Sequence, residues 1–209
     1  MKLAITFAIV ALLLYAVAMP AHGDAEGGGC GLLEDFDFVT PPALPPGWTA
    51  VNGINPDGIL WQTSDSGDPT PPATTPPNAA WVNDPNTISD KYLYSPTGAI
   101  KPGASAILTF WHNYALDEGF DGGVLEISVD GGPFQDILEA GGFFEQGGYN
   151  GTISTCCGNP LGGRQAWTGN SSGFVNTWVD LPVSPTHAFT LRWRMASDSN
   201  GSGGGLEGR

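Results

Sequence analysis

The sequence predicts an all-β protein, a two-sheet antiparallel sandwich of the jelly-roll type. The first observation is composition: 31 glycines and 18 prolines stand against only 13% charged residues, which is typical of short strands separated by turns. The second is a period of two in hydrophobicity along residues 124–129 and 189–195, which puts apolar side chains on one sheet face. The third is that no repeat of roughly 40 residues is visible, which disfavours a propeller.

The first 23 residues have the pattern of a secretory signal peptide. Lys2 precedes an apolar run over residues 3–18, and small residues stand at both cleavage-defining positions, Ala21 and Gly23, before Asp24. The run is shorter than the roughly 20 residues that a membrane-spanning helix needs. We therefore expect residues 1–23 to be removed and the protein to be secreted, without a membrane span.

The remaining chain divides into a flexible leader at 24–31, a sandwich domain at 32–199 and a flexible, glycine-rich tail at 200–209. This length suits one domain better than two. Residues 32–39 alternate acidic and apolar side chains in a short strand pattern. The proline-rich stretch 41–48 cannot form a regular strand, because proline has no N–H for a ladder, so we expect an extended edge segment with Trp48 turned inward.

Further strands are expected where short runs are apolar, β-branched or alternating: residues 59–63, 80–82, 91–94, 106–114, 124–129, 174–181 and 189–195. Residues 130–132, Asp-Gly-Gly, form a favoured tight turn because glycine readily takes positive φ. The turn should return the chain through residues 134–138 as a hairpin. Residues 64–78 indicate an exposed loop, and residues 140–163 a long ordered loop or two irregular strands.

Three cysteines in an exported chain leave an odd number. Cys156 and Cys157 are adjacent, and a disulfide between neighbours is strained, so a bond from Cys30 to one of them is the more comfortable pairing. Lipidation of Cys30, as in a cell-surface lipoprotein, is less favoured because Gly28 stands where the processing enzyme usually meets an apolar residue. A redox or metal role for the adjacent pair lacks a second Cys pair or a nearby His.

The formal net charge of −14 disfavours nucleic acid and anionic membranes as partners, since seven Lys and Arg cannot neutralise a phosphate backbone. An acidic chain suits divalent cations instead. Three carboxylates lie within five residues at Asp117, Glu118 and Asp121, and hard oxygen ligands of this kind suit Ca²⁺. Further candidate ligands are Asp35, Asp37 and Asp198. The alternative interpretation of the acidic loop is a solvated tip.

A ligand site is suggested by aromatic residues in the glycine-rich region. Tyr149, Arg164 and Trp167, together with Phe143, could form a platform for a glycan or an extracellular protein surface. Aromatic rings stack on the apolar faces of sugars, and Arg supplies directional donors. Packing of the loop onto the sandwich would explain the same residues.

Short blocks follow one another in the order Phe36 with LPPGW at 44–48, LTFWH at 108–112, DGGVLEIS at 121–128, GYNGT at 148–152, NPLGGRQAW at 159–167 and LRWR at 191–194. In this order, over most of residues 34–205, they resemble the MAM-like and cleaved-adhesin jelly-roll modules of secreted bacterial proteins. The resemblance implies a concanavalin A-like β-sandwich that is an accessory module beside a secreted peptidase or on a surface adhesin, often with structural calcium. Such modules end in a strand resembling Gly-Trp-x-Ile-Asp-x-Val. The resemblance thus implies that the last strand is missing here, and it leaves open a covalently linked domain beyond Arg209.

Catalysis has weaker support. Some concanavalin A-like folds hydrolyse β-glucans with carboxylates two residues apart on one strand; here Glu126, Ser128 and Asp130 occupy those positions, and the middle one lacks a carboxylate. No His-Glu-x-x-His zinc motif occurs, and His112 beside Trp111 is expected to be structural. The predicted function is a secreted, non-catalytic adhesion or accessory binding module. A glycan hydrolase, or a fragment of a larger secreted peptidase, is the alternative.

Overall fold

The computed structural model describes residues 10–17, 33–54, 57–66, 76–99 and 105–199. Within these ranges the regular elements are strands without a helix, and their pairing is antiparallel, so the all-β prediction is confirmed. No helix of the described part is long and apolar enough to cross a membrane. The expected leader 24–31, the tail 200–209 and Cys30 lie outside the described residues.

The larger sheet has six strands. Its order is β10 (Gln135–Asp136), β9 (Gly122–Val129), β15 (Ala188–Ser197), β6 (Ser89–Tyr94) and β3 (Thr49–Ile54), with β7 (Gly98–Ala99) paired to β15. Strands β9 and β15 pair over eight residues, and β15 and β6 over six. The strand expected at 189–195 is therefore the centre of this sheet.

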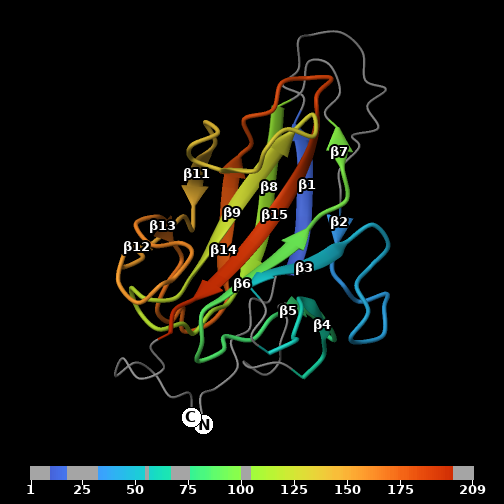
Figure 1. Ribbon diagram of the computed structural model, residues 1–209. Coiled ribbons are helices and arrows are strands. Elements are labelled where there is room, and N and C mark those ends of the chain that lie inside the picture. The colour runs from blue at the N-terminus through green and yellow to red at the C-terminus, as the bar shows by residue number, and fades with distance from the viewer. Residues whose placement is uncertain (1–9, 18–32, 55–56, 67–75, 100–104, 200–209) are drawn as a thin grey trace, which may run out of the picture.

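The second sheet has five strands. Its order is β11 (Phe143–Gln146), β14 (Val175–Asp180), β8 (Ser105–His112), β1 (Val10–Val17) and β2 (Leu33–Glu34). Two short strand pairs lie outside these sheets in the described residues, β4 (Gln62–Ser64) with β5 (Ala79–Trp81) and β12 (Gly151–Thr152) with β13 (Gln165–Ala166). Figure 1 shows the two larger sheets as layers, the six-stranded one in front.

The core lies between these layers. Phe110 of β8 meets Trp193 of β15 edge-on, with ring centroids 5.7 Å apart, so the contact joins one sheet to the other. Trp48 packs against the same Trp193 ring at 5.7 Å, which confirms that it turns inward after the prolines. Leu108 and Leu191 are fully buried beside them. The apolar side chains of β8 and β15 thus face one shared interior.

The predicted hairpin after β9 is confirmed. Asp130 and Gly131 both have positive φ, 51° and 71°, as a tight two-residue turn between antiparallel strands requires. The returning strand β10 has only two residues, with Gln135 opposite Ile127. By contrast, β8 and β9 do not pair with each other: the acidic loop between them carries the chain from the five-stranded to the six-stranded sheet.

Strand β9 differs from the expectation of a half-buried strand, because both of its faces are buried. Val124, Glu126 and Ser128, the outward positions, are each at most 4% exposed. Val124 is buried because it packs in a second, small hydrophobic cluster with Ile153, Leu161, Ala166 and Ala196. The long glycine-rich loop therefore covers this part of the sheet.

Two other segments depart from expectation. The strand expected over residues 32–39 is only β2, because the acidic side chains turn the backbone: Glu34 Oε1 accepts the N–H of Phe36 and Asp35 Oδ1 that of Asp37. Residues 10–17, expected within the signal peptide, form strand β1 in the five-stranded sheet.

Candidate functional site

Three aromatic side chains are exposed on the outer side of the five-stranded sheet. Trp111 of β8 is 37% exposed, Trp178 of β14 47% and Phe143 of β11 60%. The three strands are hydrogen-bonded side by side in the order β11-β14-β8. We call this set of three residues the aromatic face.

Strand parity explains why these rings point outward. In β14, Val175, Thr177 and Val179 turn toward the core. Trp178 therefore lies on the outer side of the sheet with Asn176 and Asp180. Trp111 pairs with Asn176, and Phe143 pairs with Asp180, which places both on the same side. The aromatic face is therefore built by the regular pleat of the sheet.

The rings are close to one another and carry polar neighbours. Trp111 is opposite Asn176, two residues from Trp178, and such diagonal neighbours lie roughly 7–8 Å apart. The Trp178 indole N–H donates to Asn176 Oδ1, and Gln146 Nε2 donates to the Asn176 carbonyl at 3.2 Å. These bonds orient the Trp178 ring and leave amide groups beside it.

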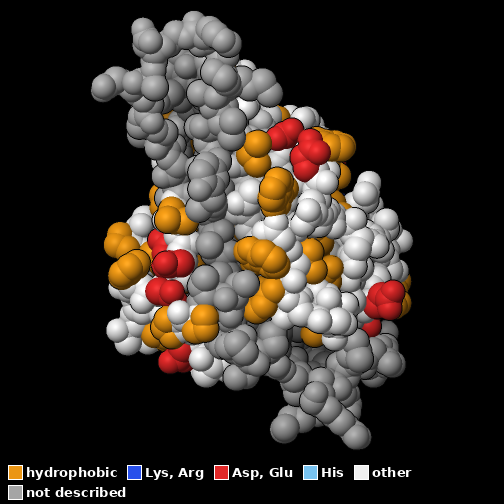
Figure 2. Space-filling view, turned by 180° about the vertical axis from the view of Figure 1, so that it is seen from behind, with side chains coloured by type: hydrophobic (Ala, Val, Ile, Leu, Met, Phe, Trp, Pro, Cys, Tyr) orange, Lys and Arg blue, Asp and Glu red, His pale blue; other side chains and the backbone are white. Residues whose placement is uncertain are grey.

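Figure 2 shows this side of the molecule. Hydrophobic side chains gather in its middle, acidic ones lie near its margins, and no Lys or Arg is visible among its described atoms. Lys91 is buried, and the described arginines lie on the other sheet or on the loop that covers it. The aromatic face is thus apolar with an acidic surround.

Of the ligand residues predicted from the sequence, Phe143 is on the aromatic face, but Tyr149, Arg164 and Trp167 lie elsewhere. Trp167 is 1% exposed, its N–H donates to the Gly147 carbonyl at 2.9 Å, and its ring packs edge-on against Phe110 and Tyr149. Trp167 is therefore a core residue and is not presented to a ligand. Burial, followed by the charge of Asp136, raises the pKa of Tyr149 well above its usual range, and the Tyr149 hydroxyl donates to Asp136 at 3.1 Å. Both residues pack the glycine-rich loop onto the sandwich.

Arg164 is part of a charged network on the outer side of the six-stranded sheet. Its guanidinium binds Glu126 Oε1 at 2.6 Å and Asp136 Oδ2 at 2.7 Å. Arg192 binds the other oxygen of Glu126 at 2.5 Å, and Arg194 binds Oε1 at 3.3 Å. Burial alone would raise the pKa of Glu126, but these three arginines outweigh it and lower the pKa.

Aromatic rings complete this network. The Arg192 guanidinium lies 4.2 Å from the ring centre of Phe134 and 4.6 Å from that of Tyr92. Arg194 forms a two-point pair with Asp90, at 2.7 and 2.9 Å. Charges and donors here are satisfied internally, so the network stabilises the outer side of the sheet.

The residues of the hydrolase alternative are not arranged as an acid and a nucleophile. Glu126, held ionised by arginines, is a poor proton donor. Ser128 Oγ donates to the Gly132 carbonyl at 2.6 Å, and Asp130 accepts the N–H of Ala188 at 2.9 Å in the turn. His112 is fully buried, which lowers its pKa to about 3, and its Nε2 bonds to the Thr177 hydroxyl. His112 is therefore neutral and structural.

The acidic loop is partly buried. Asp121 and Asp198 are each 2% exposed, and Asp121 Oδ1 accepts the backbone N–H of Asp198 at 2.7 Å. Burial, opposed by this hydrogen bond and one from Asp84 and reinforced by the charges of Asp198 and Asp117, raises the pKa of Asp121 to about 6. The sequence pattern indicates Asp117, Asp121 and Asp198 as candidate ligands but gives no signal for Asp84, which lies in the loop after β5.

The other expected calcium ligands are separate from this cluster. Glu118 is exposed, with its aliphatic stem near Gly169. Asp35 accepts the backbone N–H of Asp37 within the turn after β2. Among the described residues, no three Asp, Glu, His or Cys side chains are already arranged as a metal shell. The cluster of Asp84, Asp117, Asp121 and Asp198 nevertheless has the hard oxygen donors and surplus negative charge that Ca²⁺ prefers.

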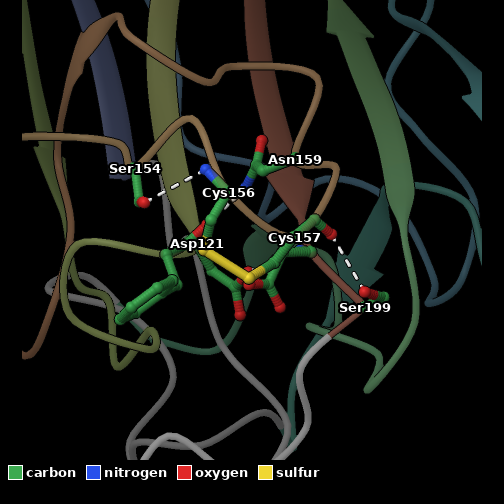
Figure 3. The surroundings of a disulfide bond; sticks show 8 residues. Asp121, Ser154, Cys156, Cys157, Asn159 and Ser199 are labelled. Carbon is green, nitrogen blue, oxygen red and sulfur yellow. Dashed lines mark hydrogen bonds between the residues drawn. A yellow bond between two sulfur atoms is a disulfide. The ribbon is translucent and has the colours of Figure 1, made fainter.

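A disulfide loop borders this cluster. Cys156 is bonded to Cys157, so the expected bond from either of them to Cys30 is wrong. The local backbone accounts for the difference: Cys157 and Gly158 have positive φ, 67° and 87°, in a tight turn. The Cys157 carbonyl accepts the N–H of Ser199 at 3.1 Å and its hydroxyl at 2.9 Å (Figure 3), which fixes the residue next to Asp198.

Comparison of the chain with family models, with curated proteins and with solved structures found no match.

Proposed function

We propose that this protein is an exported, non-catalytic binding module of the jelly-roll, concanavalin A-like type, and that it binds a neutral glycan on the aromatic face. The observation that carries the proposal is the presence of three exposed rings, Trp111, Trp178 and Phe143, on adjacent strands of one sheet. Exposed apolar area costs roughly 25 cal/mol per Å² relative to burial. A sugar stacked on the rings would recover part of this.

Charge selects the class of glycan. The net charge of −14 and the acidic surround of the face would repel sulfated or uronic acid polymers. The side-chain amides of Asn176 and Gln146 and the hydroxyl of Thr109, opposite Trp178, suit neutral sugar hydroxyls. The internal neutralisation of Glu126 supports binding without hydrolysis.

The experiment is affinity electrophoresis of the full chain in gels that contain neutral or acidic polysaccharides. Neutral polymers should retard the protein, and Trp111→Ala and Trp178→Ala should each abolish most of the retardation. Phe38→Ala is the matched control, because Phe38 is also a highly exposed ring but lies outside β8, β14 and β11. Unchanged retardation of both tryptophan variants, or retardation by acidic polymers alone, would contradict the proposal.

We also propose that calcium stabilises the module at the acidic cluster. Asp84, Asp117, Asp121 and Asp198 would hold the ion, whose charge would offset the repulsion between carboxylates gathered from three segments of the chain. Calcium that binds only the folded state raises the melting temperature. We further propose that the module serves as an accessory domain beside a larger secreted protein.

The calcium proposal predicts a higher melting temperature in excess Ca²⁺ than in chelator. Asp121→Asn removes one buried charge and keeps the acceptor for Asp198 N–H, so in chelator it should melt higher than the wild type and gain little from calcium. Glu118→Gln, at an exposed position of the same loop, should keep the full calcium response. Equal melting of the folded wild type in calcium and chelator would remove the ion from the proposal.

A further inference from the structure

Strand β1 is an interior strand of the five-stranded sheet. It pairs antiparallel with β8, from Val10 opposite Trp111 to Val17 opposite Ser105, and its other edge pairs with β2. Figure 1 shows it in the rear sheet, alongside β8. Its backbone is therefore hydrogen-bonded on both edges.

The same residues belong to the apolar run of the predicted signal peptide. Removal of residues 1–23 on export would take β1 away and leave one edge of β8 without a partner. That edge would present unpaired N–H and C=O groups next to the buried side chains of Ala106, Leu108 and Phe110. Neighbouring strands lie about 4.8 Å apart, so the space left between β8 and β2 would be one strand wide.

We propose that this position is a strand-acceptor site of the exported protein, and that it takes an extended peptide segment from outside these 209 residues. The occupant would pair with β8 through its backbone and place apolar side chains opposite Ala106 and Leu108. Direct backbone pairing of this kind requires a polypeptide. The inference rests on removal of residues 1–23 and is independent of glycan binding.

The other terminal segments of this chain lack the apolar residues that such a strand needs. Residues 24–32 read DAEGGGCGL and residues 200–209 read NGSGGGLEGR. Both are rich in glycine, which weakens a strand, and neither has more than two apolar residues at alternate positions. The required segment is therefore short, extended and apolar on one face, as residues 10–17, VALLLYAV, are apolar throughout.

The test is strand exchange in the full chain. A protease recognition sequence replaces residues 24–29, the chain is folded and the link is cut, so that only non-covalent pairing holds β1. A fluorescent peptide with the sequence of residues 8–19 is added in excess. We expect one labelled peptide to be incorporated per chain, with the melting temperature preserved. The matched control is the same peptide N-methylated at alternate residues on the edge facing β8, and it should not be incorporated because its donors are blocked.

Three results would overturn the proposal. In the first, the cut fragment that contains β1 dissociates, the melting temperature does not change and no peptide is taken up. β8 would then need no partner. Another is assembly of the cut chain into dimers that take up no peptide, because the occupant would then be a second copy. The last is an exported protein that still carries residues 10–17. Glycan binding by the aromatic face can fail or succeed without changing any of these results.

Discussion

Trp167 and Trp178 are the same residue type in opposite environments. The Trp167 ring fills the core against Phe110 and Tyr149, and its N–H is satisfied by a buried carbonyl. The Trp178 ring lies on the surface, and its N–H donates to the side chain of the neighbouring Asn176. The energetic consequence is that one ring stabilises the fold while the other is available to a ligand.

The two rings should therefore separate stability from binding. Trp167→Ala should cost about 3–5 kcal/mol of unfolding free energy, because it leaves a cavity in the core. Trp178→Ala should cost under about 1 kcal/mol, as expected at a surface site. Urea unfolding of both variants measures this, and a Trp178→Ala loss as large as that of Trp167→Ala would show that Trp178 is structural.

A signal for this difference is present in the sequence. Trp178 has the same parity as Asn176 and Asp180 in an otherwise alternating strand, and a large ring at a polar parity indicates an exposed platform. Trp167 follows a two-residue strand and a glycine-rich loop, where no period applies. Its burial depends on how the loop folds back onto β9, which is a tertiary property.

Glu126 gives the fold a defined acid response. Its folded pKa is lowered by three arginines from an ordinary value near 4.5, so its ionised form adds stability above that pH. The stability is lost as pH falls below about 4.5 toward the lower folded pKa. Glu126→Gln should reduce the unfolding free energy at pH 7 by about 3 kcal/mol, because Arg192 loses its carboxylate partner and Arg164 and Arg194 each lose one of two. The gap to wild type should narrow between pH 5 and pH 3; a gap constant with pH would contradict this assignment.

At the scale of elements, β9 shows how a loop and a sheet depend on each other. Its alternation predicted a strand, and its Asp-Gly turn predicted the return to β10. The alternation did not predict that the outer side would also be covered, because that cover comes from Ile153 and Ala166, far along the chain. The same limit applies to β8 and β9, since a loop does not reveal whether the strands it joins share a sheet.

Gly122 tests the fit between loop and strand. A Cβ at this position would lie 2.6 Å from Ile153 Cδ1 and 3.0 Å from Ala166 Cβ. Gly122→Ala should therefore cost about 1–3 kcal/mol through overpacking. Ile153→Val removes the nearer methyl group, so the double variant should lose less than the sum of the single changes. Strict additivity in urea unfolding would mean that the loop does not pack on β9 as described.

At the scale of the whole molecule, the candidate sites arise where distant segments meet. The aromatic face joins β8, β14 and β11, whose order in the sheet does not follow the chain. The acidic cluster adds Asp84 to residues named from the sequence, because a loop after β5 reaches the end of β15. The disulfide Cys156–Cys157 depends on a local turn that composition does not reveal. Periodicity thus predicts strands and their faces, whereas the pairing of segments and the resulting sites require the folded chain.

Indole N–H signals offer a direct test of neutral-glycan binding by the aromatic face. The chain has seven tryptophans, each with one such signal in a ¹⁵N–¹H spectrum. On titration with a neutral oligosaccharide, the signals of Trp111 and Trp178 should shift with a common affinity, while those of buried Trp167 and Trp193 stay in place. Shifts confined to other tryptophans, or no shift with any oligosaccharide of a polymer that retards the protein in gels, would contradict it.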